Sequence, residues 1–411
     1  MPKKIGFLTF GHWSGTANSA VPTGAAAVRQ MVDLAQAAER SGFDGAWLRV
    51  HHFDRSLSAP FPLLAAMAAS TTTLEVGTGV IDMRYENPLY MAEEAAVTDA
   101  IARGRMQLGI SRGSPEPAAN GQELFRYTLG EGESWSSVTR ERAATFREAI
   151  AGTPIARPVH PEQHGGQLLP ITPVSPGLEN RIWWGAAGFE TAEWAGREGM
   201  NLLSSTLLLE DDGRPFHIAQ RDQIRRYLDS YNASGHTTGG QTAVTRSAFP
   251  VITDTDDLYF GRRERGDSVG QIEGMRARSG PTYAGSLDEL AELFTRDAAM
   301  SEADYLLFAL PNQLGVEYNE HVMANITKVV KDIGWKKPPF RAPEHLGLWA
   351  FRGCSGRPRG QLHISGGDSP EPPRAAGKNE MLCPVEEIFR TYSQRQTLDD
   401  SLLPVSPQVG A

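Results

Sequence analysis

Short apolar runs alternate with stretches of helical periodicity along the first 340 residues. The runs that predict strands lie at residues 5–10, 46–50, 74–78, 106–110, 181–186, 202–205, 242–253 and 305–310. Apolar residues recur at helical spacing at 28–41, 61–70, 88–102, 139–151, 191–199, 214–231, 287–296 and 316–333. Strands that alternate with helices form parallel sheets with covered faces. A count near eight favours an α/β fold that closes into a (β/α)8 barrel of the TIM type.

Two stretches interrupt this alternation. Residues 254–281 are charged and rich in arginine, and they fall between the seventh predicted strand and the helix at 287–296. We interpret them as an insertion that forms a solvated loop, with a lid over a substrate as the alternative. Residues 341–411 show little hydrophobic periodicity and many Gly and Pro residues. We therefore expect a barrel at 1–340 and an irregular, poorly ordered C-terminal extension at 341–411.

Composition excludes several classes of protein. The chain has 40 Lys and Arg against 49 Asp and Glu, a net charge of −9, which argues against a nucleic-acid partner. No apolar stretch is long enough to span a bilayer, and the N-terminus lacks a signal-peptide pattern, so we expect a cytoplasmic protein with no membrane partner. The two cysteines, Cys354 and Cys383, fit neither a disulfide framework nor a zinc site.

Candidate chemistry follows the predicted strands. In barrels of this type the active site lies at the C-terminal ends of the strands. Polar or glycine-rich residues follow each of the first five strands, which is more than connecting loops require. These segments are Gly11-His12-Trp13, His51-His52-Phe53-Asp54, Gly77-Thr78-Gly79-Val80, Ser111-Arg112-Gly113-Ser114 and Gly185-Ala186-Ala187-Gly188-Phe189-Glu190-Thr191.

Two of these segments suit a phosphate group. Gly188 precedes a predicted helix, whose first backbone N–H groups and dipole favour an anion. Thr191 can add a hydroxyl donor, and Arg112 from the neighbouring strand end can make a bidentate charged contact. An ordinary helix cap without a ligand is the alternative.

The adjacent His51 and His52 offer acid–base chemistry. Because neighbouring residues of an extended strand point to opposite sides, only one of the two can face the barrel mouth. A pocket histidine can act as a base near neutral pH, and a purely structural histidine is the alternative. The other histidines before the extension have no acidic partner at a ligand spacing, so we expect no metal site.

The order and spacing of short motifs over residues 3–335 resemble those of the luciferase-like flavin-dependent monooxygenases. The motifs are Gly42-Phe43-Asp44-Gly45-Ala46-Trp47, His51-His52-Phe53, Leu74-Glu75-Val76-Gly77-Thr78-Gly79, Asn87-Pro88, Gly104-Arg105-Met106-Gln107-Leu108-Gly109-Ile110-Ser111-Arg112-Gly113, Glu190-Thr191-Ala192-Glu193-Trp194-Ala195 and Tyr283-Ala284-Gly285-Ser286. The resemblance implies a barrel that binds reduced FMN, or the deazaflavin F420 in some branches, at the strand C-termini. It also implies a homodimer.

The resemblance further implies which residues bind the cofactor. Arg112 corresponds to the phosphate-binding arginine, and Ala187, Gly188 and Thr191 correspond to the helix N-terminus that completes the phosphate site. A non-proline cis peptide would join Gly79 to Val80 beneath the flavin ring, with Ser111 beside the cofactor.

The resemblance also places residues on the substrate side. His51 corresponds to the catalytic histidine of luciferase, and His12, Trp13 and His52 would line the substrate pocket. Val50 replaces an acidic residue of luciferase, and Ser111 replaces a reactive cysteine. These departures imply oxygenation without useful light emission.

The implied function is a monooxygenase that uses reduced FMN and O2 on a small organic substrate through a flavin C4a-(hydro)peroxide. No Gly-x-Gly-x-x-Gly motif follows a predicted strand, so a separate flavin reductase would supply the reduced flavin. Two alternatives stay open: an F420-dependent oxidoreductase, and a non-catalytic flavin-binding subunit. A barrel hydrolase is disfavoured because the sequence lacks the paired carboxylates or metal ligands that such chemistry needs.

Overall fold

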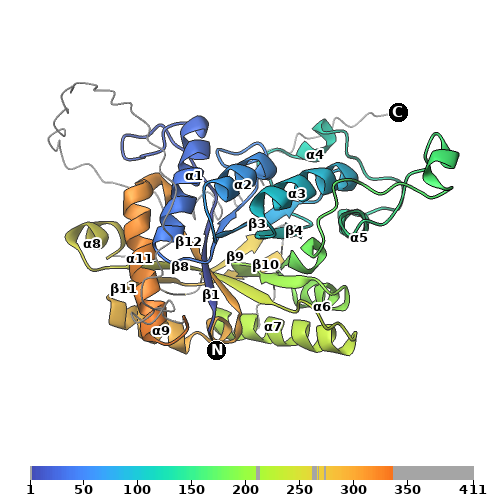
Figure 1. Cartoon of the computed structure of the whole chain (residues 1–411). Coiled ribbons are helices and arrows are strands. Elements are labelled where there is room, and N and C mark those ends of the chain that lie inside the picture. Colours follow the sequence, from blue (N-terminus) through green and yellow to red (C-terminus); the bar gives the residue numbers. More distant parts are fainter. Residues whose placement is uncertain (1, 210–212, 262–265, 267, 273–274, 337–411) are drawn as a thin grey trace, which may run out of the picture.

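Eight parallel strands form a closed barrel in the computed structural model. The structure describes residues 2–209, 213–261, 266, 268–272 and 275–336 (Figure 1). The barrel strands are β1 (Lys4–Thr9), β2 (Gly45–Leu48), β3 (Glu75–Asp82), β4 (Met106–Ser111), β5 (Ile182–Ala186), β6 (Asn201–Ser204), β8 (Thr242–Pro250) and β12 (Tyr305–Ala309). β12 pairs with β1 and with β8, and β6 pairs with β8, which closes the ring. The predicted barrel and its eight strands are confirmed.

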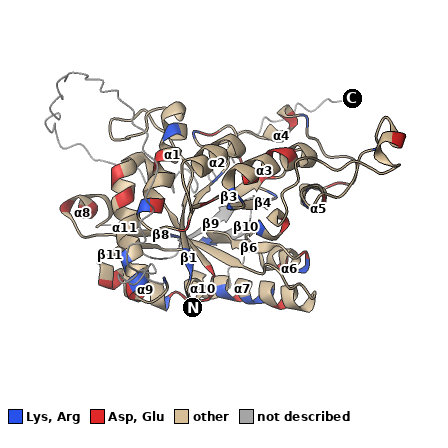
Figure 2. Ribbon diagram, in the orientation of Figure 1, with Lys and Arg blue, Asp and Glu red and all other residues tan. Residues whose placement is uncertain are grey.

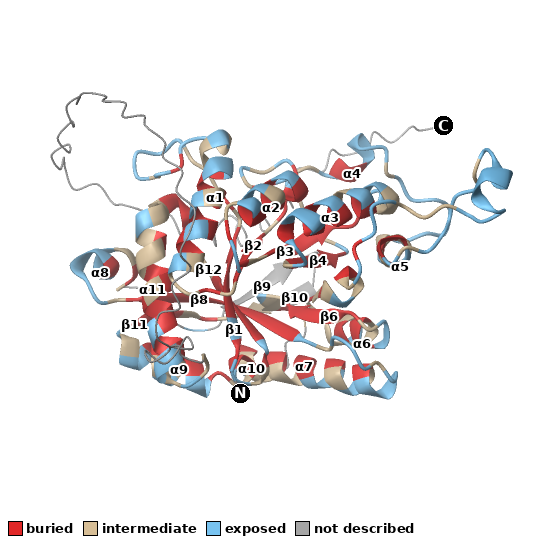
Figure 3. Ribbon diagram, viewed as in Figure 1, coloured by how far each residue is buried: buried red, intermediate tan, exposed pale blue. Residues whose placement is uncertain are grey.

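Helices surround the barrel and bury their apolar faces against it (Figure 3). The long helices are α1 (Gly24–Arg40), α2 (Pro60–Ala69), α3 (Pro88–Ala102), α5 (Trp135–Ile150), α6 (Phe189–Arg197), α7 (Phe216–Ala233), α9 (Leu287–Arg296) and α11 (Val316–Asp332). Four of these helices have a capping side chain at their start: Thr23, Asn87, Ser134 and Ser286 each accept a hydrogen bond from a first-turn amide. At these four helices, a local signal marks where the helix begins.

Charged residues of both signs are interspersed along the outer helices (Figure 2). Some of them form exposed ion pairs between neighbouring helices. Arg40 of α1 pairs with Glu320 of α11 at 2.8 Å, and Arg225 of α7 pairs with Glu302 of α10 (Ala298–Glu302). Exposed pairs of this kind contribute less than about 1 kcal/mol each, so the barrel depends mainly on its apolar core.

Large aromatic side chains fill the barrel interior. Trp47 packs edge-on against both Trp183 and Tyr305, with ring centroids 5.4 Å apart in each case. Glycines make room for these rings: a Cβ on Gly45 would lie 1.9 Å from the Tyr305 hydroxyl. Because Tyr305 begins β12, this packing closes the N-terminal half of the barrel and leaves its C-terminal end for chemistry.

The third strand is longer than predicted. Its prediction stops at residue 78 because Gly77 and Gly79 suggest a turn, yet β3 continues to Asp82. Its register against β4 shifts between Thr78 and Ile81, and the Gly79–Val80 peptide within this interval is cis. The cis peptide is thus where the sequence analysis expects it, although it lies inside the strand rather than after it.

The insertion at 254–281 is more regular than a solvated loop, which corrects that prediction. It contains α8 (Asp254–Phe260) and the antiparallel strands β9 (Ser268–Ile272) and β10 (Met275–Ser279), and β10 pairs with β7 (Leu207–Leu208). β11 (Thr282–Gly285) then adds to β8. Capping by Thr253 explains the helix, because its hydroxyl accepts from the amide of Asp256.

The extension predicted at 341–411 lies outside the described residues. Within the part of the chain that the structure describes, no helix combines the length and the apolar character needed to cross a membrane.

Candidate active site at the carboxyl end of the barrel

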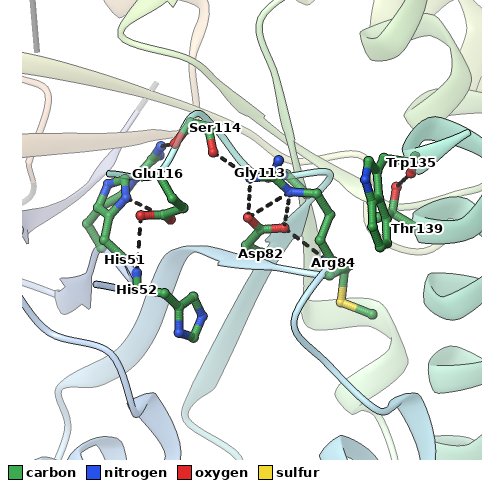
Figure 4. A network of polar contacts seen from close by, with 12 residues as sticks. His51, His52, Asp82, Arg84, Gly113, Ser114, Glu116, Trp135 and Thr139 are labelled. Carbon is green, nitrogen blue, oxygen red and sulfur yellow. Dashed lines mark hydrogen bonds and ion pairs between the residues drawn. The ribbon is translucent and has the colours of Figure 1, made fainter. Parts of the chain in front are cut away.

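His51 lies just beyond β2 and is only 5% exposed. Its Nδ1 is 3.0 Å from Glu116 Oε1 (Figure 4). Its Nε2 is 3.3 Å from Nε of Arg49. The Arg49 group can only donate, so Nε2 accepts and carries no proton. A neutral ring then has its proton on Nδ1 and donates it to the Glu116 carboxylate.

Burial explains why this pair is not an ordinary salt bridge. Desolvation, with a further contribution from the Arg49 charge, lowers the pKa of His51 to about 3. Desolvation also raises the pKa of Glu116 to about 7, opposed by the His52 backbone N–H and by Arg49 and Arg84. His51 is therefore neutral at pH 7, whereas Glu116 titrates near neutrality.

Arg49 joins three parts of the site. Besides His51, its Nη1 donates to the carbonyl of Gly79 at 3.2 Å, and its Nη2 donates to Ser114 Oγ at 3.2 Å. It therefore links the end of β2, the cis peptide in β3 and the segment after β4. The sequence analysis missed Arg49. Its partners Gly79 and Ser114 lie far along the chain and are visible only in the fold, so its position two residues before His51 is the only signal in the sequence.

A second arginine holds the segment that carries Arg112 and Glu116. Arg84 binds the nearly buried carboxylate of Asp82 through Nε and Nη2, at 2.7–3.1 Å, and also donates to the carbonyl of Ser114. Gly113 passes close to this pair: a Cβ there would lie 2.0 Å from Asp82 Oδ2. The path of the chain after β4 is thus set by β3 (Figure 4).

Aromatic rings separate the two histidines. The rings of His12 and His51 both stack near Phe10, at centroid distances of 5.1 Å and 5.7 Å. His52 instead stacks on Tyr85 at 4.0 Å, and Phe125 meets it edge-on. The structure thus brings His12 and His51 to one cluster of rings and directs His52 to another, which agrees with the expectation that adjacent side chains diverge.

Trp13 lies beside His12 in sequence but has its own neighbours. The guanidinium of Arg55 lies over its ring at 5.5 Å, and a Cβ on Gly24 would touch its indole nitrogen at 3.3 Å. Its place in a substrate pocket stays a prediction.

The predicted cofactor residues lie on adjacent strands. A Cβ on Gly185 would lie 3.0 Å from Val80 Cγ1 and 3.3 Å from Ser111 Cβ, so these three positions meet across β3, β4 and β5. Gly188 caps α6 without a side chain over the first-turn amides, and Thr191 is the third residue of that helix.

Arg112, an exposed residue, follows β4, and Gly109 of β4 is in register with Trp183 of β5. Arg112 and the N-terminus of α6 therefore leave neighbouring strands at the same end of the barrel. Guanidinium, hydroxyl and helix-terminal amides are the donors that suit a phosphate. The chemistry of the donor set fits FMN, and the sharing of one phosphate by these groups stays a prediction.

Curated relatives match about half of the chain. The "Flavin-dependent trigonelline monooxygenase, oxygenase component" of Acinetobacter baylyi is 38% identical over 193 residues, which are 44% of this chain and 50% of the relative. The alkanal monooxygenase alpha chain of the Kryptophanaron alfredi symbiont is 35% identical over 242 residues, 56% of this chain and 60% of the relative. The chain thus spans about half the length of the curated relatives it matches.

Solved structures share the fold over most of their length. The oxygenating constituent of 3,6-diketocamphane monooxygenase from Pseudomonas putida, in complex with FMN, has a TM-score of 0.58 at 15% identity and covers 80% of this chain and 98% of its own. An F420-dependent secondary alcohol dehydrogenase has a TM-score of 0.52 at 14% identity, with 80% and 99% covered. The family model described as luciferase-like monooxygenase matches residues 8–260. The chain belongs to the luciferase-like monooxygenase family.

Proposed function

We propose that the chain is the oxygenase component of a two-component flavin-dependent monooxygenase. It would take reduced FMN from a separate flavin reductase and use O2 to oxygenate a small organic substrate. The observation that carries the proposal is the arrangement at one barrel end, where anion-type donors beside β5 accompany a buried, neutral histidine beside β2. A homodimer and the absence of useful luminescence belong to the same proposal.

The cofactor side is assigned by the chemistry of its donors. Arg112, Thr191 and the first-turn amides after Ala187 and Gly188 would hold the phosphate, while Val80 and Ser111 would lie against the ring system. Reduced FMN, when bound, supplies the electrons that activate O2. FMN is favoured over F420 because the relative that is 38% identical over 193 residues is named as flavin-dependent.

The substrate side is assigned by the groups that control protons and water. The neutral His51 ring accepts a proton at Nε2, and Arg49 holds that ring and the Gly79 carbonyl in one frame. The rings of Phe10 and Tyr85 flank His51 and His52, respectively, and would help to keep water from the reacting atoms. The small organic substrate would meet His12 and Trp13 on this side, whereas a substrate contact of His52, which packs against Tyr85 and Phe125, stays a prediction.

Binding of the reduced cofactor tests the assignment. Anaerobic titration should show that reduced FMN binds more tightly than reduced F420. The Arg112→Ala variant should weaken the affinity for reduced FMN by about 10- to 100-fold, the value of one charge-assisted contact. Arg296→Ala, which removes an exposed arginine on α9, is the matched control and should change nothing. Tighter binding of F420 would replace the proposal with an F420-dependent oxidoreductase, and an unchanged Arg112→Ala affinity would remove Arg112 from the phosphate site.

A further inference from the structure

We propose that Glu116 is the positioning residue of His51: it fixes the imidazole as the Nδ1–H tautomer, so that Nε2 carries the lone pair that accepts a proton. This role deepens the proposed function. It rests on that function only for the source of the proton that His51 receives. Glu116 lies in the segment after β4, at a position that no motif of the sequence analysis used.

The contacts of Glu116 are specific for the histidine pair. Its side chain is 3% exposed, Oε1 lies 3.0 Å from Nδ1 of His51, and Oε2 accepts the backbone N–H of His52 at 3.2 Å. Both carboxylate oxygens are therefore used, one on a ring nitrogen and the other on the adjacent backbone amide. These two hydrogen bonds fix the orientation of the His51 imidazole and the position of the backbone at His52 (Figure 4).

The other ring nitrogen faces a donor that has further anchors. Arg49 Nε donates to His51 Nε2 at 3.3 Å, while its two terminal nitrogens bind the Gly79 carbonyl and Ser114 Oγ. Arg49 can release this long hydrogen bond and stay in place. A proton from a ligand then adds to Nε2, and the carboxylate that accepts from Nδ1–H stabilises the resulting imidazolium, as carboxylates do for catalytic histidines.

Two cations and two anions lie near the His51–Glu116 pair. Arg49 and Arg84 face Glu116 from the ends of β2 and β3, whereas Asp54 and Asp82 are the nearby anions. Burial raises the pKa of Glu116 to about 7, so its carboxylate is present above that pH. Below it, a protonated Glu116 becomes a donor to Nδ1 and the tautomer reverses. The pH dependence of the His51 tautomer should therefore follow Glu116.

The sharpest variant is Glu116→Gln. An amide has one acceptor and one donor group, and the His52 backbone N–H can only donate. The amide oxygen must therefore face His52, and the amide NH2 must face Nδ1 of His51. The neutral ring then faces a donor at each nitrogen and can accept from only one of them. Because Arg49 can release its 3.3 Å hydrogen bond while it keeps Gly79 and Ser114, we expect the ring proton to move to Nε2, which then cannot accept.

The experiment reads the two ring nitrogens of His51 by 15N NMR at pH 8, with the signals assigned through His51→Gln. The wild-type protein should show a protonated Nδ1 and an unprotonated Nε2. The Glu116→Gln variant should exchange the two chemical shifts, and Glu116→Asp, which keeps a carboxylate, should restore at least part of the wild-type pattern. Glu123→Gln makes the same chemical change at an exposed position of the same segment and should leave the spectrum unchanged.

Each outcome decides the proposal. A wild-type ring protonated on Nε2, or a Glu116→Gln ring that keeps its proton on Nδ1, overturns it. If Glu116→Gln does not fold, the wild-type tautomer and its reversal below about pH 7 still decide. Reduced FMN binding is measured on the same samples. A wild-type protein that binds no reduced FMN contradicts the proposed function, while the tautomer of His51 is read independently of it.

Discussion

At the residue scale, the site depends on how burial changes the chemistry of ordinary side chains. His51 is a neutral acceptor because its ring is buried and because Arg49 donates to Nε2. The sequence and the family resemblance point to His51, but they could not reveal Glu116. The two residues are 65 positions apart, and glutamate is too common for one residue to stand out without the fold.

His52 provides a prediction about stability and pH. Desolvation, with smaller contributions from the neighbouring His51 and from the Arg84 guanidinium, lowers the pKa of His52 from 6.5 to about 4. A lowered folded-state pKa means that the unfolded chain binds the proton first, so stability present above pH 6.5 is lost as the pH falls toward 4. His52→Phe keeps a ring against Tyr85 but removes the titrating group.

Urea unfolding at pH 6.5 and pH 5 measures this effect. The wild-type protein should lose about 1–2 kcal/mol more than His52→Phe between the two pH values. Taking the difference between the two proteins removes the opposing contributions of Glu116 and Glu86, whose pKa values burial raises to about 7. Equal losses in the two proteins would show that His52 does not titrate at a lowered pKa.

At the scale of elements, the segment after β4 is held by β3. The Asp82–Arg84 pair contacts Ser114 and leaves no room for a side chain on Gly113, whose φ is +89°. This explains how a segment with little regular structure can place Glu116 with defined geometry. It also explains why the sequence could not show the arrangement: Gly113 resembles any turn glycine until Asp82 is placed beside it.

Gly113→Ala tests this dependence. The substitution combines an unfavourable positive φ with displacement of the buried Asp82–Arg84 pair, so we expect a loss of about 3 kcal/mol or more in the free energy of unfolding. Gly132→Ala has a similar φ of +78° and open space around the new Cβ. The control should therefore lose only the backbone contribution, about 1 kcal/mol. Similar losses in both variants would mean that Asp82 and Arg84 do not hold the segment.

The third strand shows where local signals mislead. Gly77 and Gly79 suggest a turn, yet both are interior positions of β3 that the barrel core requires to be small. A Cβ on Gly77 would lie 3.0 Å from Trp47 Cδ2, and one on Gly79 would lie 3.0 Å from Leu8 Cδ1. The reason for these glycines is packing against other strands, which a reading of neighbours along the chain cannot detect.

At the scale of the whole molecule, the barrel was predictable and its additions were not. The alternation of strands and helices predicts eight parallel strands because each βα unit has its own hydrophobic periodicity. The strands β9 and β10 pair with each other outside this alternation, and β10 also pairs with β7, a two-residue strand more than 50 positions earlier. The positions at the strand ends predict a candidate site from the sequence, whereas its long-range polar contacts are visible only in the fold.

The most direct test of the account is the fate of reduced flavin on the protein. Photoreduced FMN is mixed with the purified chain and then with oxygenated buffer, and the appearance of oxidised FMN is followed beside free reduced FMN and the Arg112→Ala variant. The account predicts that the wild-type chain delays the appearance of oxidised FMN and that the variant loses the delay at the same flavin concentration. Oxidation at the rate of free FMN in the presence of the wild-type chain would contradict the proposed flavin-dependent oxygenation.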